Sequence, residues 1–160
     1  MKDLKRVMAC VDLSEYTELT LEYTLALVRG LEVEIILFNV INTRDIDTAQ
    51  TVSVYLPGWT NAEDYIKRLK EERYQKIQEI IEKLFVVDKP HFKILVQVGT
   101  PFEAILKAIS KEKVDLVILG NKGKSNLVGT LHGSNGEKVF RHSPVPVLSV
   151  RDRKRFSRNR

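Results

Sequence analysis

Short apolar runs alternate along this chain with longer stretches whose apolar residues recur at helical spacing. Apolar and β-branched runs of this length are typical of strands buried in a sheet. They predict strands over residues 7–11, 33–40, 91–98, 114–119 and 145–150. The stretches between them predict helices over residues 14–30, 60–85, 100–111 and 134–142.

Capping signals mark several of these helix ends. Thr100, Pro101 and Glu103 combine an N-cap residue, a first-turn proline and a glutamate three positions after the cap. The first helix is expected to be capped by Ser14 and to stop at Gly30. Its expected apolar stripe is Leu19, Tyr23, Ala26 and Leu27. The stripe expected on the 60–85 helix is Tyr65, Leu69, Ile77, Ile80, Ile81 and Leu84.

The alternation of strands and helices predicts a five-stranded open parallel sheet with helices on both faces, in the α/β class. Residues 41–60 lack a regular pattern and are expected to form a long loop, either functional or mobile. Residues 1–150 are expected to form a single domain, followed by a basic tail over residues 151–160.

The net charge of +5 is concentrated in that tail, where six Lys or Arg and one Asp account for all of it. A mobile, solubilising end is the expected role, with attraction to polyanions such as nucleic acid as the alternative. No apolar run reaches the roughly 18–20 residues of a membrane span, and no signal-peptide pattern opens the chain. With a single cysteine, Cys10, these features predict a cytoplasmic protein.

Residues 120–134 are rich in glycine and follow the apolar run 114–119 directly. Ser134 and Glu137 form an S-x-x-E capping box, which predicts that a helix begins there. A glycine-rich loop between a strand and a helix N-terminus offers backbone N–H groups to an anion, so this stretch is a candidate phosphate site. The alternative is that the glycines only allow tight turns.

Two standard phosphate motifs are excluded here. A Walker A loop needs a glycine five positions before Gly123, where this chain has Ile118 inside the predicted strand. A G-x-G-x-x-G dinucleotide fingerprint is also missing. The sequence therefore argues against a P-loop NTPase and against NAD or FAD binding in the Rossmann manner.

The spacing Gly-x2-Gly-x9-Gly-Ser, between an apolar strand and a helix followed by a P-V-L-x-V strand, resembles the universal stress protein family. The resemblance implies a Rossmann-like fold of the adenine nucleotide alpha hydrolase type with strand order 3-2-1-4-5. It further implies binding of ATP or a related nucleotide, ADP or AMP, and a role as a stress-response sensor or regulator. On this basis Asp12 would lie near the ribose, and the Val40 backbone would meet the adenine edge. The positions implied around the nucleotide are Ala9, Cys10, Val11, Asp12, Val40, Leu119, Gly120, Gly123, Lys124, Gly133, Ser134, Asn135 and Gly136.

The chain departs from the family pattern at Gly136, where many nucleotide-binding members carry a second hydroxyl residue. Lys122 and Lys124 are candidate compensating charges, or else ordinary exposed lysines. The histidines show no metal-ligand spacing, so a divalent cation such as Mg²⁺ is expected only with the nucleotide phosphates. Ser134 has no histidine partner in the sequence, which predicts binding rather than enzymatic catalysis, with slow hydrolysis left open.

The resemblance also implies a homodimer that pairs residues 145–150 with their copy, whereas Pro144 and Pro146 favour a blunted edge and a monomer. Three alternative functions stay open. They are a stress protein that acts through protein contacts without a nucleotide, a nucleotide hydrolase or transferase, and nucleic-acid binding by the tail.

Overall fold

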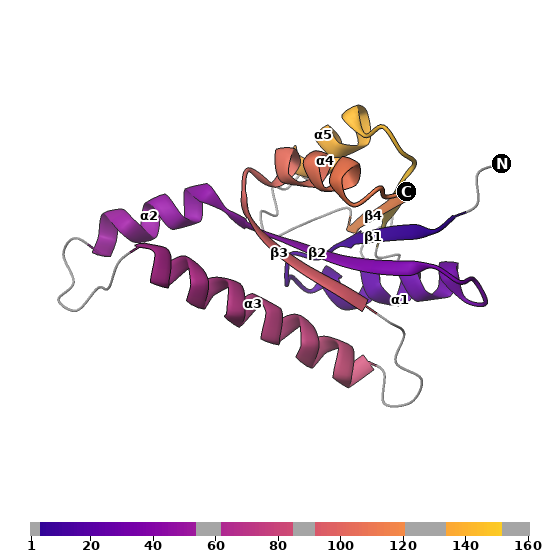
Figure 1. The fold of residues 1–160 in the computed structure, drawn as a ribbon, viewed down its shortest axis with the longest axis horizontal. Coiled ribbons are helices and arrows are strands. Elements are labelled where there is room, and N and C mark those ends of the chain that lie inside the picture. The colour runs from indigo at the N-terminus through magenta and orange to yellow at the C-terminus, as the bar shows by residue number, and fades with distance from the viewer. Residues whose placement is uncertain (1–3, 54–61, 85–91, 121–133, 152–160) are drawn as a thin grey trace, which may run out of the picture.

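The computed structural model describes residues 4–53, 62–84, 92–120 and 134–151, which form a sheet with helices on both faces (Figure 1). The strands are β1 (Arg6–Cys10), β2 (Glu34–Asn42), β3 (Phe92–Gly99), β4 (Leu116–Gly120) and β5 (Val147–Val150). The helices are α1 (Tyr16–Val28), α2 (Thr43–Ser53), α3 (Ala62–Leu84), α4 (Pro101–Lys111) and α5 (Ser134–His142). All pairings are parallel and the order is β3-β2-β1-β4-β5, as predicted.

Each face of the sheet has its own core, because successive side chains of a strand point to opposite faces. Val7 and Ala9 of β1 pack with Leu21 of α1 and Ile77 of α3. Met8 of β1 packs on the other face, in the cluster that includes buried residues of α4 and α5. In Figure 1, α4 and α5 accordingly lie on one side of the sheet, and α1 and α3 on the other.

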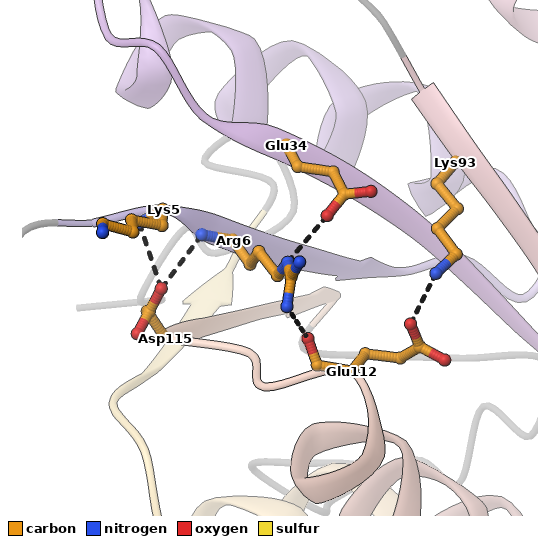
Figure 2. Close-up of polar contacts among 6 residues, drawn as sticks. All are labelled: Lys5, Arg6, Glu34, Lys93, Glu112 and Asp115. Carbon is orange, nitrogen blue, oxygen red and sulfur yellow. Dashed lines mark hydrogen bonds and ion pairs between the residues drawn. The ribbon is translucent and has the colours of Figure 1, made fainter.

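Polar contacts tie together the amino-terminal edge of the sheet (Figure 2). Asp115 Oδ2 accepts a hydrogen bond from the Arg6 backbone N–H at 3.0 Å. The Arg6 guanidinium donates to Glu34 Oε2 at 2.8 Å and to the Glu112 carbonyl at 3.1 Å. Lys93 Nζ of β3 pairs with the Glu112 carboxylate. These contacts join β1, β2 and β3 to the turn between α4 and β4, so this edge is closed while the carboxyl edge carries the candidate site.

The expected loop over residues 41–60 is wrong in its first part. β2 continues to Asn42, whose Oδ1 accepts from the Arg44 backbone N–H at 3.2 Å, and α2 follows directly. Ile46 anchors this helix with only 4% of its surface exposed. Among residues 43–48, the part of α2 whose burial is described, Ile46 is the one buried side chain, and a single buried position gives no apolar period to detect from the sequence. The rest of the expected loop, residues 54–60, lies outside the described residues.

The apolar stripe predicted for α1 is also wrong. Tyr23, Ala26 and Leu27 are exposed, and Leu19 is half-buried. The buried residues of the helix are Tyr16, Thr17, Thr20, Leu21, Thr24 and Val28. Threonine is tolerated on this face because its hydroxyl can donate to the carbonyl one turn earlier, as Thr20 and Thr24 do at 2.8 and 2.7 Å. The helix begins at Tyr16 with Glu15 at the N-cap, one residue later than the predicted cap at Ser14, although Ser14 Oγ accepts from the Tyr16 N–H at 3.3 Å.

The predicted stripe on α3 is confirmed, since Ile77 and Ile81 are buried and its other members are half-buried. The cap predicted at Thr100 is only partly realised. Its carbonyl accepts from the Ala104 N–H at 2.9 Å, but its side chain makes no capping bond. β4 and β5 each begin two residues later than predicted. Val114 still belongs to the end of α4, because its N–H donates to the Ile109 carbonyl at 3.0 Å. The pairing of β4 with β5 begins where the Val117 N–H donates to the Pro146 carbonyl at 3.0 Å.

Candidate functional site

The carboxyl ends of β1 and β4 lie side by side, with Cys10 paired opposite Leu119. Asp12 follows β1, and the chain then enters α1 on one face of the sheet. Gly120 ends β4, and the next helix, α5, packs on the opposite face. Open α/β sheets bind ligands outside the carboxyl ends of the strands at such a switch point. The structure therefore brings Asp12 and Gly120 to the predicted edge.

A tight polar turn shapes the chain after β1. Asp12 Oδ1 accepts a hydrogen bond from the Ser14 N–H at 3.0 Å, and Ser14 Oγ accepts from the Tyr16 N–H at 3.3 Å. Leu13 between them has φ of 59°, in the left-handed region that costs a leucine conformational energy. These contacts hold the Asp12 carboxylate in one place, at the start of α1 and beside the switch point.

Val40 lies near the end of β2 and is half-buried, packed against the core shared with α4 and α5. Its neighbour Asn39 is 1% exposed and donates from Nδ2 to the Val11 carbonyl at 2.7 Å. Asn39 was not among the predicted site residues. Its signal in the sequence was a single amide residue inside the apolar run that forms β2, and this signal did not say which backbone group the amide would bind.

The phosphate end of the predicted site is described only in part. Gly123, Lys124 and Gly133, together with Lys122, lie outside the described residues. Ser134 opens α5 as predicted, but its side chain is also outside the description. Asn135 is exposed and Gly136 is half-buried against Leu119. Glu137 pairs with Arg141, one turn along the same helix, at 2.9 Å.

The predicted residues of β1 divide between the two faces. The side chains of Ala9 and Val11 are 0% and 3% exposed and belong to the core under α1. Cys10 points to the face of α4 and α5, where burial raises the pKa of its thiol to about 12. The thiol therefore stays protonated at neutral pH, as expected for a small packing residue and not for a nucleophile.

Among the described residues, no group of three or more His, Cys, Asp or Glu side chains is arranged to hold a metal ion. Within the same residues, no helix combines the length and the apolar character needed to cross a membrane. A groove of about 320 Å³ lies between the end of β3 and α4. Because β2 and β1 separate β3 from β4 in the sheet, this groove is distinct from the switch point.

This arrangement defines a class of protein: a Rossmann-like α/β domain in which the direction of winding reverses between β1 and β4. The model of the universal stress protein family matches residues 3–151, nearly the whole chain. The chain belongs to that family.

Individual relatives agree with this assignment. The chain is 34% identical over 156 residues to universal stress protein MJ0577 of Methanocaldococcus jannaschii, covering 92% of this chain and 94% of the relative. A solved structure of MJ0577 matches with a TM-score of 0.74 and 32% identity, over 93% of this chain and 96% of that one. UspA from Lactobacillus plantarum shares the fold, with a TM-score of 0.68 at 16% identity, over 94% and 100% of the two chains.

Proposed function

We propose that this protein binds ATP or a related adenine nucleotide between β1 and β4 and acts as a sensor or regulator in the stress response. The observation that carries the proposal is the meeting of Asp12 and Gly120 at the switch point. The carboxylate of Asp12 can accept hydrogen bonds from ribose hydroxyls. The chain that follows Gly120 is the glycine-rich stretch suited to phosphate.

Two structural neighbours support the choice of ligand. A universal stress protein in complex with cAMP matches with a TM-score of 0.64 and 19% identity, over 94% of this chain and 98% of that one. The universal stress protein from Archaeoglobus fulgidus in complex with dAMP matches with a TM-score of 0.56, also at 19% identity, over 94% and 100%. Both ligands share an adenine base and a phosphate, and both belong to proteins of this fold.

The proposed role is binding and not rapid chemistry. The thiol of Cys10, protonated because its pKa is raised to about 12, is unsuited to nucleophilic catalysis. Any Mg²⁺ would be bound mainly by the phosphate groups of the nucleotide and would enter the site together with it. ATP turnover above about 1 s⁻¹, an ordinary enzyme rate, would contradict this part of the proposal.

We further propose that the protein is cytoplasmic and forms a homodimer through β5. In the described sheet, β5 pairs with β4 on one side only, and its Leu148 is 37% exposed. Sedimentation at micromolar concentration should give twice the 18.4 kDa mass of one chain. Leu148→Glu should shift the protein to the monomer, while Leu27→Glu, at an exposed leucine of α1, should leave the dimer intact. A wild-type monomer would contradict the dimer without touching nucleotide binding.

Thermal unfolding with and without each nucleotide tests the main proposal. A nucleotide present at 100 times its Kd should stabilise the wild-type protein by about 2.7 kcal/mol. Asp12→Asn retains an oxygen that can accept the Ser14 N–H but removes the charge, so it should reduce this increment. Asp115→Asn makes the same change at the closed, amino-terminal edge and should leave the increment unchanged. Absence of any increment in the wild type would favour a stress protein that acts through protein contacts.

A further inference from the structure

The pairing of β1 with β2 ends in an unusual way. Its last partners are Cys10 and Phe38, and the Val11 N–H still donates to the Phe38 carbonyl at 3.0 Å. In a regular parallel ladder the next bond would run from the Val40 N–H to the Val11 carbonyl. Within the described backbone that bond is not formed. The Asn39 side chain donates to the Val11 carbonyl in its place, at 2.7 Å.

Because the Asn39 side chain donates to the Val11 carbonyl, the Val40 N–H does not have this carbonyl as its partner. Alternate residues of a strand direct their N–H and C=O groups toward the same neighbouring strand. Because Phe38 directs its groups toward β1, Val40 does so as well. At the level of Val40, however, β1 has already turned away through Asp12 and Ser14 into α1. Val40 therefore presents one donor and one acceptor, side by side, to the switch point.

The same side chain also restrains the approach to Asp12. The Val11 carbonyl and the Asp12 N–H belong to one planar peptide unit, so fixing the carbonyl also fixes the direction of that N–H. The backbone of Val11 is held on both sides: its N–H donates to the Phe38 carbonyl, and its own carbonyl accepts from the Asn39 amide. From a single buried position, Asn39 thus affects both the Val40 backbone groups and the direction of the Asp12 N–H.

Burial of this amide is costly, which indicates a specific role. Asn39 is 1% exposed, and its Oδ1 has no hydrogen-bond partner among the described residues. A buried polar atom without a partner destabilises the folded state, and an apolar residue of the same size would avoid that cost. The benefit visible in the structure is the bond from Nδ2 to the Val11 carbonyl.

We propose that Asn39 is a positioning residue for base recognition: it occupies the Val11 carbonyl and so reserves the Val40 N–H and C=O for the edge of an adenine base. Adenine offers a ring-nitrogen acceptor and an amino donor next to each other on that edge, which complement this pair. The inference rests on the proposed nucleotide binding. It adds a residue that acts through its neighbours and that no sequence motif marked.

Amide hydrogen exchange of the wild-type protein gives the first test. Without nucleotide, the Val40 amide should exchange faster than the Phe38 amide, which lies inside the β1–β2 ladder. Saturation with AMP should slow exchange at Val40. If the Val40 amide is as protected as that of Phe38 before nucleotide is added, the inference is wrong. This measurement needs no variant and so does not depend on how a variant folds.

The second test compares Asn39→Leu with Asn42→Leu. The first variant removes the donor to Val11 and the unpaired oxygen together, so we expect it to fold. The Val40 N–H then becomes the nearest donor to the Val11 carbonyl and should be protected without nucleotide. Asn42 lies on the same strand but bonds to the Arg44 N–H, so its variant should leave Val40 exchange and nucleotide affinity unchanged.

Affinity for two probes separates base recognition from general damage. The probes are AMP and its 1-deaza analogue, which keeps the amino group but has a C–H in place of the ring nitrogen that would accept from the Val40 N–H. The wild type should prefer AMP, and Asn39→Leu should lose about tenfold in AMP affinity while binding the second probe as before. Equal losses for both probes, or an unchanged preference for AMP, would overturn the inference. Failure of the wild type to bind either probe would instead overturn the proposed function itself, and the inference with it.

Discussion

A side chain added at Gly136 would meet Leu119: an ideal Cβ at this position lies 3.2 Å from Leu119 Cδ1. Leu119 is 6% exposed and belongs to the core under α4 and α5, so it has little room to move. The absence of a hydroxyl residue here, noted from the sequence, therefore has a structural cause. The first turn of α5 comes so close to the end of β4 that a larger residue would require Leu119 to move by a few tenths of an ångström.

Gly136→Ser should accordingly destabilise the protein, by about 1 kcal/mol, because overpacking outweighs the gain in helix propensity. Chemical denaturation measures this change. Leu119→Val should relieve part of it, giving a favourable coupling energy in a double-mutant cycle. Gly99→Ala is the control, since its Cβ would lie 3.6 Å from the Cβ of Ala104, an ordinary contact. A Gly136→Ser variant as stable as the wild type would show that Leu119 yields freely.

The lowered pKa of Glu112 predicts how the free energy of unfolding changes at acid pH. The hydrogen bond from Lys93 is the main reason that the pKa of Glu112 lies below its usual 4.5. Desolvation raises this pKa, and the positive charge of Lys93 lowers it further. A carboxylate with a lowered folded-state pKa stabilises the protein above its unfolded pKa, and this contribution disappears as the pH falls through the folded value. Between about pH 6 and pH 3, the wild type should therefore lose more stability than Glu112→Gln.

The control for this pH series is Glu103→Gln, because Glu103 makes no ion pair among the described residues. Its denaturation midpoints should follow those of the wild type across the range. Identical pH slopes for the wild type and Glu112→Gln would contradict the predicted contribution of the Lys93 contact.

Lys113 occupies a position that suits glycine. It follows the end of α4 with φ of 52°, while Val114 donates back to the Ile109 carbonyl at 3.0 Å. This is the left-handed residue of a helix C-terminal motif, where glycine avoids the steric cost of a Cβ. Lys113→Gly should raise the free energy of unfolding by about 0.5–1 kcal/mol. Lys107→Gly, inside α4, should lower it by about 1 kcal/mol, and a loss in both variants would contradict the prediction.

Cys10 supplies a convenient probe, since it is the only cysteine in the chain. Burial raises the pKa of its thiol to about 12, against an ordinary value of 9.0. At pH 8 the folded protein should therefore react with a thiol reagent far more slowly than the unfolded protein, whose thiol has an ordinary pKa. Above about pH 9 the unfolded thiol ionises and the folded thiol does not, so stability should fall as pH rises. Cys10→Ala should lack this part of the pH slope.

The sequence alone determined the five strands and four of the five described helices, whereas α2 lay in the stretch expected to be a loop. Each strand is an apolar run with β-branched residues, and this local property needs no knowledge of the partners. A chain that alternates in this way forms a parallel sheet, so Asp12 and Gly120 could be expected at one edge from the sequence alone. The order of the strands came from resemblance to a known family, because local patterns do not say which strands are neighbours.

Tertiary structure decided which residues each pattern buries. The threonine face of α1 is buried because its hydroxyls bond within the helix, while the more apolar Tyr23 and Leu27 face outward. The role of Asn39 depends on β1 ending opposite it, twenty-eight positions away in the sequence. The closeness of Gly136 to Leu119 likewise depends on how α5 docks on the sheet. Such contacts join distant parts of the chain, and their distances exist only once the sheet and its helices have packed together.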